Sequence, residues 1–227
     1  MNNVTIKQSG MQKEKVCSKK KCFSPEVIKR LSLYLRDLKN LQEQEVEVIS
    51  SDEITKMLDI SSAQFRKDLS YFGEFGKRGV GYEVSFLIRE LEKILGIYRW
   101  WDIALVGVGR LGSALLGFSG FPQFKLRITA AFDNDRKKIG KAISGVEVKS
   151  LEEMPAVIKK GGIEIGMICV PPQFAQSIAE RMVGAGIKSI LNFAPVSIKL
   201  PAEGIYIANV DMACELQTLV YFLNRRH

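Results

Sequence analysis

The sequence predicts an α/β protein with two folded parts, an N-terminal winged helix-turn-helix and a C-terminal Rossmann dinucleotide-binding domain. Three observations lead to this fold class. Apolar residues recur at helical spacing in the first hundred residues, which end in a glycine-rich stretch and one more helix. Apolar strands then alternate with helices, as in a parallel sheet covered on both faces. The first of these strands runs into a glycine motif typical of nucleotide-binding turns.

Length and composition are those of an ordinary globular protein. The 227 residues suffice for two domains, and 46% are hydrophobic against 26% charged. We see neither a membrane-length apolar run nor a signal peptide, so we expect a cytoplasmic protein without a membrane partner. The four cysteines form no CxxC pair and no metal site. His227, the last residue, is the only histidine, which excludes an internal histidine as general base or metal ligand.

Positive charge is concentrated at the start of the chain. Residues 1–30 hold eight Lys and Arg against Glu14 and Glu26, whereas the whole chain carries +8. We assign residues 1–23 to a basic disordered tail. Such an arm either follows a phosphate backbone or only solubilises the protein, and the sequence leaves both interpretations open.

The winged helix is expected within residues 24–100. Ser24 followed by Pro25 starts the first helix, Ser50-Ser51 supplies the cap of the second, and Ser61 or Ser62 caps the third. Glycines between positions 73 and 81 indicate a tight hairpin, the wing. The predicted elements are helices at 25–41, 51–59, 62–72 and 83–96, with the hairpin at 73–82.

The third helix has the surface of a DNA-reading helix. Phe65, Leu69 and Phe72 face the core, which leaves small, amide and basic side chains outside, suited to a DNA groove. Because Asp68 and Glu74 keep the segment only mildly basic, an ordinary solvated helix is the alternative. The candidate DNA-contacting residues of helix and wing are Ser62, Ala63, Gln64, Arg66, Lys67, Ser70, Lys77 and Arg78.

The Rossmann domain is expected at residues 101–211, with an apolar helix after it. Predicted strands are 103–108, 126–133, 163–170, 188–193 and 205–210, and the final helix lies within 212–227.

A glycine motif marks the nucleotide site. The G-x-G-x-x-G run follows an apolar strand and opens a helix, and Asp133 ends the next strand, 21 residues after Gly112. The helix N-terminus would hold the pyrophosphate. Asp133 would bond the ribose hydroxyls, which favours NAD(H), although the basic run 136–138 leaves NADP(H) open, and coenzyme A remains an alternative. The run consists of Gly107, Val108, Gly109, Arg110, Leu111 and Gly112.

A hydride-transferring enzyme usually needs a proton donor near its substrate. The sequence offers no supported candidate, so we expect a protein that is not an enzyme and uses the nucleotide as a signal. A dehydrogenase with an accessory domain, a regulator sensing another nucleotide, and a constitutive DNA-binding protein with a vestigial nucleotide fold are the alternatives.

Longer stretches resemble one known family. The run Ser62–Tyr82 is similar to the signature of the redox-sensing repressor Rex, and the resemblance extends over residues 24–224. Further matching motifs are Gly107–Gly112, Asp133-x-Asp135, Lys138-Ile139-Gly140, Val170-Pro171, Leu191-Asn192-Phe193-Ala194-Pro195 and Val210-Asp211.

The resemblance implies a homodimeric transcriptional repressor with a domain-swapped C-terminal helix. NADH would close the dimer and release two-fold symmetric operator DNA, whereas NAD⁺ would permit binding. Packing of the last helix on its own Rossmann domain is the alternative. The matching positions also imply that Val170 and Pro171 lie near the nicotinamide and that Arg36 and Asp211 exchange contacts across the subunit boundary; otherwise Arg36 is a solvated surface residue.

One position departs from the family pattern. Some members carry tyrosine where this chain has Phe118. Phe118 can still cover the nicotinamide, but it has no hydroxyl for the carboxylate at position 211, so we expect redox discrimination to depend on other contacts.

Overall fold

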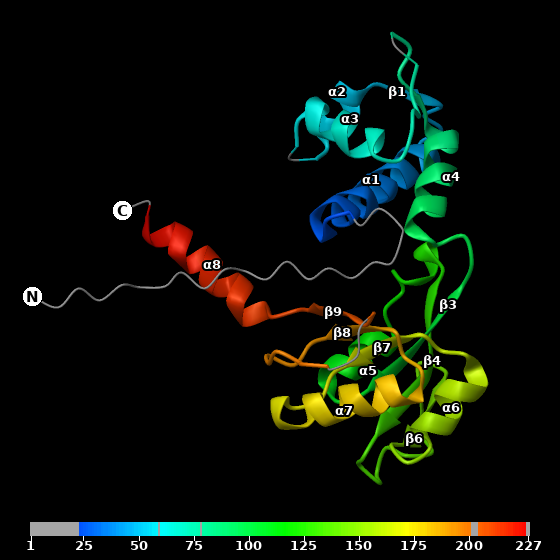
Figure 1. The fold of residues 1–227 in the computed structure, drawn as a ribbon, viewed down its shortest axis with the longest axis vertical. Coiled ribbons are helices and arrows are strands. Elements are labelled where there is room, and N and C mark those ends of the chain that lie inside the picture. The colour runs from blue at the N-terminus through cyan, green and yellow to red at the C-terminus, as the bar shows by residue number, and fades with distance from the viewer. Residues whose placement is uncertain (1–22, 59, 78, 201–203, 226–227) are drawn as a thin grey trace, which may run out of the picture.

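A computed structural model describes residues 23–58, 60–77, 79–200 and 204–225. Two domains follow each other along the chain, and the helix α8 (Met212–Asn224) projects away from both (Figure 1). The predicted basic tail lies outside the described residues except for Phe23, as do Arg78 of the predicted wing and the final two residues. Within the described part, no helix is both long and apolar enough to cross a membrane.

The N-terminal domain is a winged helix whose helices begin at polar caps. Ser24 and Ser61 accept backbone N–H bonds, and Ser50 forms a reciprocal capping box with Glu53. A short antiparallel ladder joins β1 to β2, and Lys77 pairs with Gly81 in the wing. The elements are α1 (Pro25–Glu43), β1 (Val48–Ile49), α2 (Ser51–Lys56), α3 (Ser62–Ser70), β2 (Tyr82–Glu83) and α4 (Val84–Leu95).

One apolar cluster holds this domain together. Tyr34 of α1 and Phe65 of α3 are fully buried, with ring centroids 4.9 Å apart in an edge-on arrangement. Leu69 is also buried and Phe72 is partly buried, which confirms the predicted inner face of α3. The three-helix arrangement therefore fixes which side of α3 faces solvent.

The C-terminal domain has a seven-stranded sheet in the order β5-β6-β4-β3-β7-β8-β9. All pairings are parallel except that of the edge strand β5. Without β5 this is the Rossmann strand order, with its topological switch point between β3 and β7. The strands are β3 (Trp101–Val106), β4 (Leu126–Asp133), β5 (Ala142–Ile143), β6 (Val146–Ser150), β7 (Ile165–Ile168), β8 (Ser189–Asn192) and β9 (Tyr206–Asn209).

Helices cover both faces of this sheet. One core cluster packs α6 (Met154–Gly161) and α7 (Pro172–Ala185) against the sheet, and another includes Leu115 and Leu116 of α5 (Arg110–Leu116) on the opposite face. The predicted two-sided packing is thereby confirmed. The sequence reasoning missed β5 and β6, because they are short and separated only by a turn at Ser144 and Gly145.

The two domains touch next to their linker. Trp101 donates its indole N–H to the carbonyl of Gly96, the left-handed residue that ends α4. Phe124, in the 3₁₀ turn η1 (Pro122–Phe124), packs against the apolar cluster of the winged helix. Lys39 of α1 donates to the carbonyl of Gln123, at 2.9 Å. A segment of the Rossmann domain thus contacts the winged helix directly.

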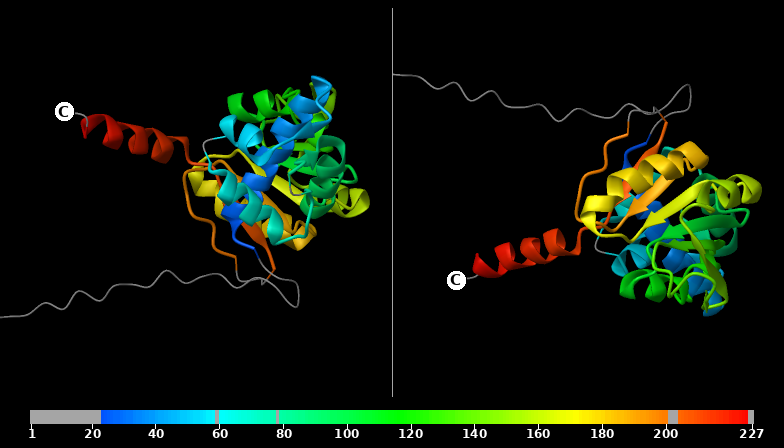
Figure 2. Two further views of the ribbon diagram at one scale, coloured as in Figure 1. Left: turned by 90° about the horizontal axis from the view of Figure 1, so that it is seen from above. Right: turned by 90° about the horizontal axis from the view of Figure 1, so that it is seen from below.

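The C-terminal helix α8 is unpartnered in the single chain. None of its side chains is buried, and Leu216, Leu219 and Leu223 are each about 60% exposed. Seen from above and from below, α8 points away from both domains (Figure 2). The alternative in which α8 packs on its own Rossmann domain is therefore wrong for this chain.

Candidate nucleotide site and DNA-reading surface

The glycine turn between β3 and α5 is packed too tightly for side chains at two positions. Gly107 has φ +96°, and a Cβ there would lie 2.5 Å from the carbonyl oxygen of Cys169. A Cβ on Gly112 would lie 2.0 Å from the carbonyl oxygen of Gly107. At Gly109, by contrast, no described heavy atom lies within 4 Å of that position. The turn therefore opens outward at Gly109, where a phosphate can approach the backbone.

Asp133 lies beside this turn at the end of β4 and is buried. Its carboxylate accepts the backbone N–H of Val108 at 2.8 Å and of Asp135 at 2.9 Å, and the ammonium of Lys138 at 3.1 Å. Burial raises the pKa of Asp133, but these hydrogen bonds and the lysine outweigh it and lower the pKa. Asp133 is thus an ionised acceptor within the site.

A cavity of about 460 Å³ opens over the switch point between β3 and β7. It is mainly apolar, with a few charged side chains in its lining, as expected for a nucleotide site. The residues lining it are Val106, Gly107, Gly109, Asp133, Asn134, Lys138, Leu151, Cys169, Val170, Pro171, Phe174, Ser177, Ile178 and Arg181.

Five of the predicted cofactor residues line this cavity and five do not. Gly107, Gly109, Asp133, Val170 and Pro171 line it. Val108 instead donates its N–H to the carboxylate of Asp133, and the other four belong to α5 or follow it. The predicted residues outside the lining are Val108, Arg110, Leu111, Gly112 and Phe118.

One wall of the cavity was missed by the sequence reasoning. It comes from α7, whose residues Phe174, Ser177, Ile178 and Arg181 follow an i, i+3, i+4, i+7 pattern. This pattern was visible in the sequence directly after Pro171. The sequence pattern did not show that this face of α7, which follows β7, lies opposite the glycine turn across the cavity.

The basic run 136–138 does not form a phosphate pocket of its own. Lys138 is bound to Asp133, and only Lys138 of the three lines the cavity. The ionised Asp133 would repel the 2′-phosphate of NADP(H), so the geometry favours NAD(H).

Three residues from the resemblance lie apart from the cavity in the single chain. Phe118 is 55% exposed and packs edge-on against Phe121, with 4.9 Å between ring centroids. The Nε atom of Arg36 lies 3.9 Å from a carboxylate oxygen of its neighbour Asp37. Asp211 caps α8 by accepting the backbone N–H groups of the second and third residues after it. A contact between Arg36 and Asp211 across a subunit boundary stays a prediction.

The outer face of α3 is exposed as predicted. Ala63, Arg66, Lys67 and Ser70 are exposed, whereas Ser62 and Gln64 are partly buried. Asp68 differs from the sequence-based interpretation. It is fully buried and ion-paired, so it does not lower the charge of this face.

A depression of about 620 Å³ separates α3 from the wing. Arg66 donates to the hydroxyl of Ser51 at 2.7 Å and so lies against the start of α2. Basic, hydroxyl and glycine residues together make a surface suited to the DNA backbone. The depression is lined by Ser50, Ser51, Arg66, Gly76, Lys77, Gly79, Val80, Gly81 and Tyr82.

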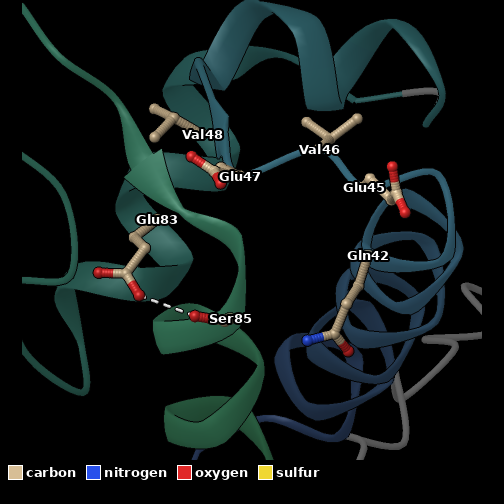
Figure 3. Close-up of a pocket in the computed structure, with 7 residues that line it drawn as sticks. All are labelled: Gln42, Glu45, Val46, Glu47, Val48, Glu83 and Ser85. Atoms are coloured by element: carbon tan, nitrogen blue, oxygen red, sulfur yellow. Dashed lines mark hydrogen bonds between the residues drawn. The ribbon is translucent and has the colours of Figure 1, made fainter.

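A second hollow in the winged helix has the opposite character. Glu45, Glu47 and Glu83 surround it, and Ser85 donates to Glu83 at 2.7 Å (Figure 3). Its carboxylates would repel a phosphate, so neither the nucleotide nor DNA fits there.

Comparisons with known proteins agree with this division of the chain. Residues 24–70 match a family described as the N-terminus of putative DNA-binding proteins, and residues 99–196 match a CoA-binding domain family. A redox-sensing transcriptional repressor Rex of Desulforamulus reducens is 47% identical over 86% of this chain and 93% of its own. The Rex of Roseiflexus sp. (strain RS-1) is 43% identical over 88% of this chain and 90% of its own.

This chain belongs to the Rex family of redox-sensing transcriptional repressors. Three solved structures of a Rex-family repressor, RSP, share its fold. The complex of RSP with β-NAD⁺ and operator DNA has a TM-score of 0.85 and 36% identity, covering 91% of this chain and 95% of RSP. The complex of RSP with β-NADH has a TM-score of 0.81 and 35% identity, covering 91% and 97%. The predicted family, the two-domain α/β fold and the role as a DNA-binding redox-sensing repressor are thereby confirmed.

Proposed function

We propose that this chain acts as a homodimer that holds operator DNA with its winged helices and releases it when NADH occupies the cavity over the glycine turn. One observation carries the proposal. A single chain joins a mainly apolar cavity of about 460 Å³, built on Gly107, Gly109 and Asp133, to a winged helix with an exposed basic face. Membership in the Rex family and the nucleotide complexes of RSP support the same function.

Different parts of the cavity suit different chemical groups of a dinucleotide. The N–H groups of the turn at Gly109 suit the pyrophosphate, and Asp133 suits the hydroxyls of the adenosine ribose. The adenine would then lie between Leu151 and the wall of α7. The nicotinamide would extend toward Val170, at the end of β7. Bound nicotinamide supplies the redox signal, and the protein supplies only shape and charge.

The nicotinamide side of the cavity favours the reduced ring. The oxidised ring is positively charged and the reduced ring is neutral, so a lining of Val170 and Pro171 disfavours the oxidised form. Cys169 adds no anion there, because burial raises the pKa of its thiol to about 12. This preference does not need the hydroxyl that Phe118 lacks.

A second copy of the chain would cover α8. Its exposed leucines make an apolar surface too large to leave in water, and family resemblance implies exchange of this helix between subunits. Arg36 of one subunit and Asp211 of the other would then contact each other in one conformation of the dimer. Two reading heads, meaning the winged helix of residues 24–100 in each subunit, would be related by two-fold symmetry and so fit a palindromic operator.

The nucleotide serves as a signal and not as a reagent in this proposal. The cavity side chains hold the dinucleotide by shape and charge, and Cys169 stays protonated at neutral pH. Cytoplasmic location and absence of turnover belong to the same proposal. Because residues 99–196 match a CoA-binding domain family, coenzyme A is the competing ligand to test.

The deciding experiment is a mobility-shift titration on a palindrome selected from random DNA by the protein itself. We expect NADH to release the DNA and NAD⁺ or coenzyme A to leave it bound, all at one salt concentration. Equal effects of NADH and NAD⁺ would contradict redox sensing. Release by coenzyme A alone would assign the cavity to that ligand, and steady consumption of NADH with small carbonyls would show an enzyme.

A further inference from the structure

The carboxylate of Asp68 is the most densely bonded side chain in the reading head. It lies on α3 and has no exposed surface. Arg30 donates two hydrogen bonds to it, from Nε at 2.6 Å and from Nη2 at 2.8 Å. Tyr34 donates its hydroxyl at 2.7 Å, and Gln64 donates its side-chain N–H at 2.7 Å. Two residues of α1 therefore hold one residue of α3, which in turn holds Gln64.

The charge on Asp68 decides how Gln64 is oriented. Burial raises the pKa of this carboxyl, but the bonds from Arg30, Tyr34 and Gln64 outweigh it and lower the pKa, so the group is ionised at neutral pH. An ionised carboxylate only accepts hydrogen bonds. The NH₂ group of Gln64 must therefore face Asp68, and its amide cannot rotate by half a turn without placing oxygen against oxygen.

This orientation leaves a defined pattern on the outer side of Gln64. One amide N–H is used by Asp68, so one N–H and the carbonyl oxygen remain. Gln64 is only partly buried, and it lies on the helix whose neighbours Ala63 and Lys67 are exposed. A donor beside an acceptor matches the N7 and N6 positions of adenine in the major groove.

Arg66 is held for a different task. Its guanidinium donates to Ser51 at the start of α2, at 2.7 Å, beside the depression under the wing. Arg66 therefore lies in the depression whose basic, hydroxyl and glycine lining suits backbone phosphates, and it is already engaged with α2.

We propose that Gln64 recognises an adenine of the operator through its free N–H and carbonyl oxygen, and that Asp68, held by Arg30 and Tyr34, is the positioning residue that sets this specificity. The inference rests on the proposed operator binding. It goes beyond it by assigning base discrimination to one residue of the reading head and its orientation to a buried ion pair.

The test pairs a protein variant with a modified base. Each adenine of one half-site, in the palindrome selected by the wild-type protein, is replaced singly with 7-deazaadenine, which lacks the N7 acceptor. We expect wild-type affinity to fall about 10-fold at one position. Gln64→Met keeps the side-chain length but not the amide, so it should bind the normal operator about 10-fold more weakly and lose nothing further at that position.

The positioning role of Asp68 has its own measurement. Asp68→Asn can offer an N–H to Gln64, which frees the amide to turn, so discrimination between adenine and 7-deazaadenine should disappear while the salt dependence of binding stays the same. Tyr34→Phe removes one bond without changing the charge and is the matched control that keeps the discrimination. Should Asp68→Asn fail to fold, the Gln64→Met pair still decides the base assignment.

The outcomes separate this inference from the proposed function. If wild-type protein selects no palindrome or ignores NADH, the proposed function fails. If wild-type protein binds and responds to NADH, but Gln64→Met keeps normal affinity and full sensitivity to the modified adenine, the assignment of Gln64 is wrong. Retained discrimination in folded Asp68→Asn would overturn the positioning role alone.

Discussion

At the scale of single residues, close backbone contacts explain the glycine turn better than any side chain does. Gly107 adopts positive φ next to the carbonyl of Cys169, and Gly112 lies against the carbonyl of Gly107. Both leave no room for a Cβ, whereas Gly109 leaves its outer side open. The three glycines of the motif therefore serve two purposes. Gly107 and Gly112 allow tight packing, and Gly109 allows a ligand to approach the backbone.

Gly112→Ala should weaken NADH binding while DNA binding persists. The added methyl would meet the carbonyl of Gly107 at 2.0 Å, so the turn must move. We expect NADH affinity measured by calorimetry to fall at least ~10-fold, a cost of about 1.4 kcal/mol. Gly184→Ala on α7 has open space and is the matched control, expected to bind NADH normally. Unchanged NADH affinity in Gly112→Ala would contradict the assigned turn.

The buried ion pair of Asp68 should make stability fall in acid. Because the folded-state pKa of Asp68 lies below its ordinary value of 3.8, its contribution is fully present above about pH 3.8 and is lost as pH falls through the lower, folded-state pKa. Asp68→Asn should lose about 1.5–3 kcal/mol at pH 7, since Arg30 loses its ion pair and one of its two hydrogen bonds. The measurement is thermal unfolding of both proteins between pH 2 and 7, where a parallel acid dependence would contradict it.

At the scale of elements, the C-terminal helix α8 shows most clearly the difference between locating a helix and knowing what covers it. Sequence patterns located α8, because its apolar residues follow one another at helical spacing. They did not decide what covers it, since an apolar helix packs equally well on its own domain or on another subunit. The structure excludes the first within a single chain, because α8 extends away from both domains (Figure 2).

Leu219→Glu should weaken the dimer. Leu219 is 60% exposed in the single chain, and burying such a side chain stabilises by about 1.5–3 kcal/mol. We expect the dimer dissociation constant in analytical ultracentrifugation to rise by at least ~10-fold. Lys160→Glu, at the exposed end of α6, is the control that leaves it unchanged. A Leu219→Glu protein that remains as firmly dimeric would show that α8 is not the interface.

At the scale of the whole molecule, one short segment joins helix α5 of the Rossmann domain to the winged helix. The segment that follows α5 carries Phe118 and Phe121 at one end and Phe124 at the other. Phe124 packs into the apolar cluster of the winged helix, and Lys39 bonds the neighbouring carbonyl of Gln123. A shift of α5, which begins at the glycine turn, would therefore have a route to α1 within one subunit.

Phe124→Ala should reduce this coupling more than it changes either binding event alone. If NADH weakens operator binding ~100-fold in the wild type, the coupling is about 2.7 kcal/mol, and operator DNA must weaken NADH binding by the same factor. We expect that factor to fall severalfold in Phe124→Ala, measured by NADH titration with and without operator. Intrinsic NADH affinity should change less than about threefold. Full coupling in the variant would place the connection elsewhere.

The sequence by itself determined what depends on neighbours in the chain. Caps at Ser24, Ser50 and Ser61 began the helices, and the glycine run and Asp133 located the nucleotide turn, because these features act over a few residues. Only the tertiary structure decided that Asp68 is buried, since its partner Arg30 lies 38 residues away. Likewise, α7 walls the cavity and α8 stands free because strand order and domain packing bring distant segments together or keep them apart, and local patterns carry no information about that.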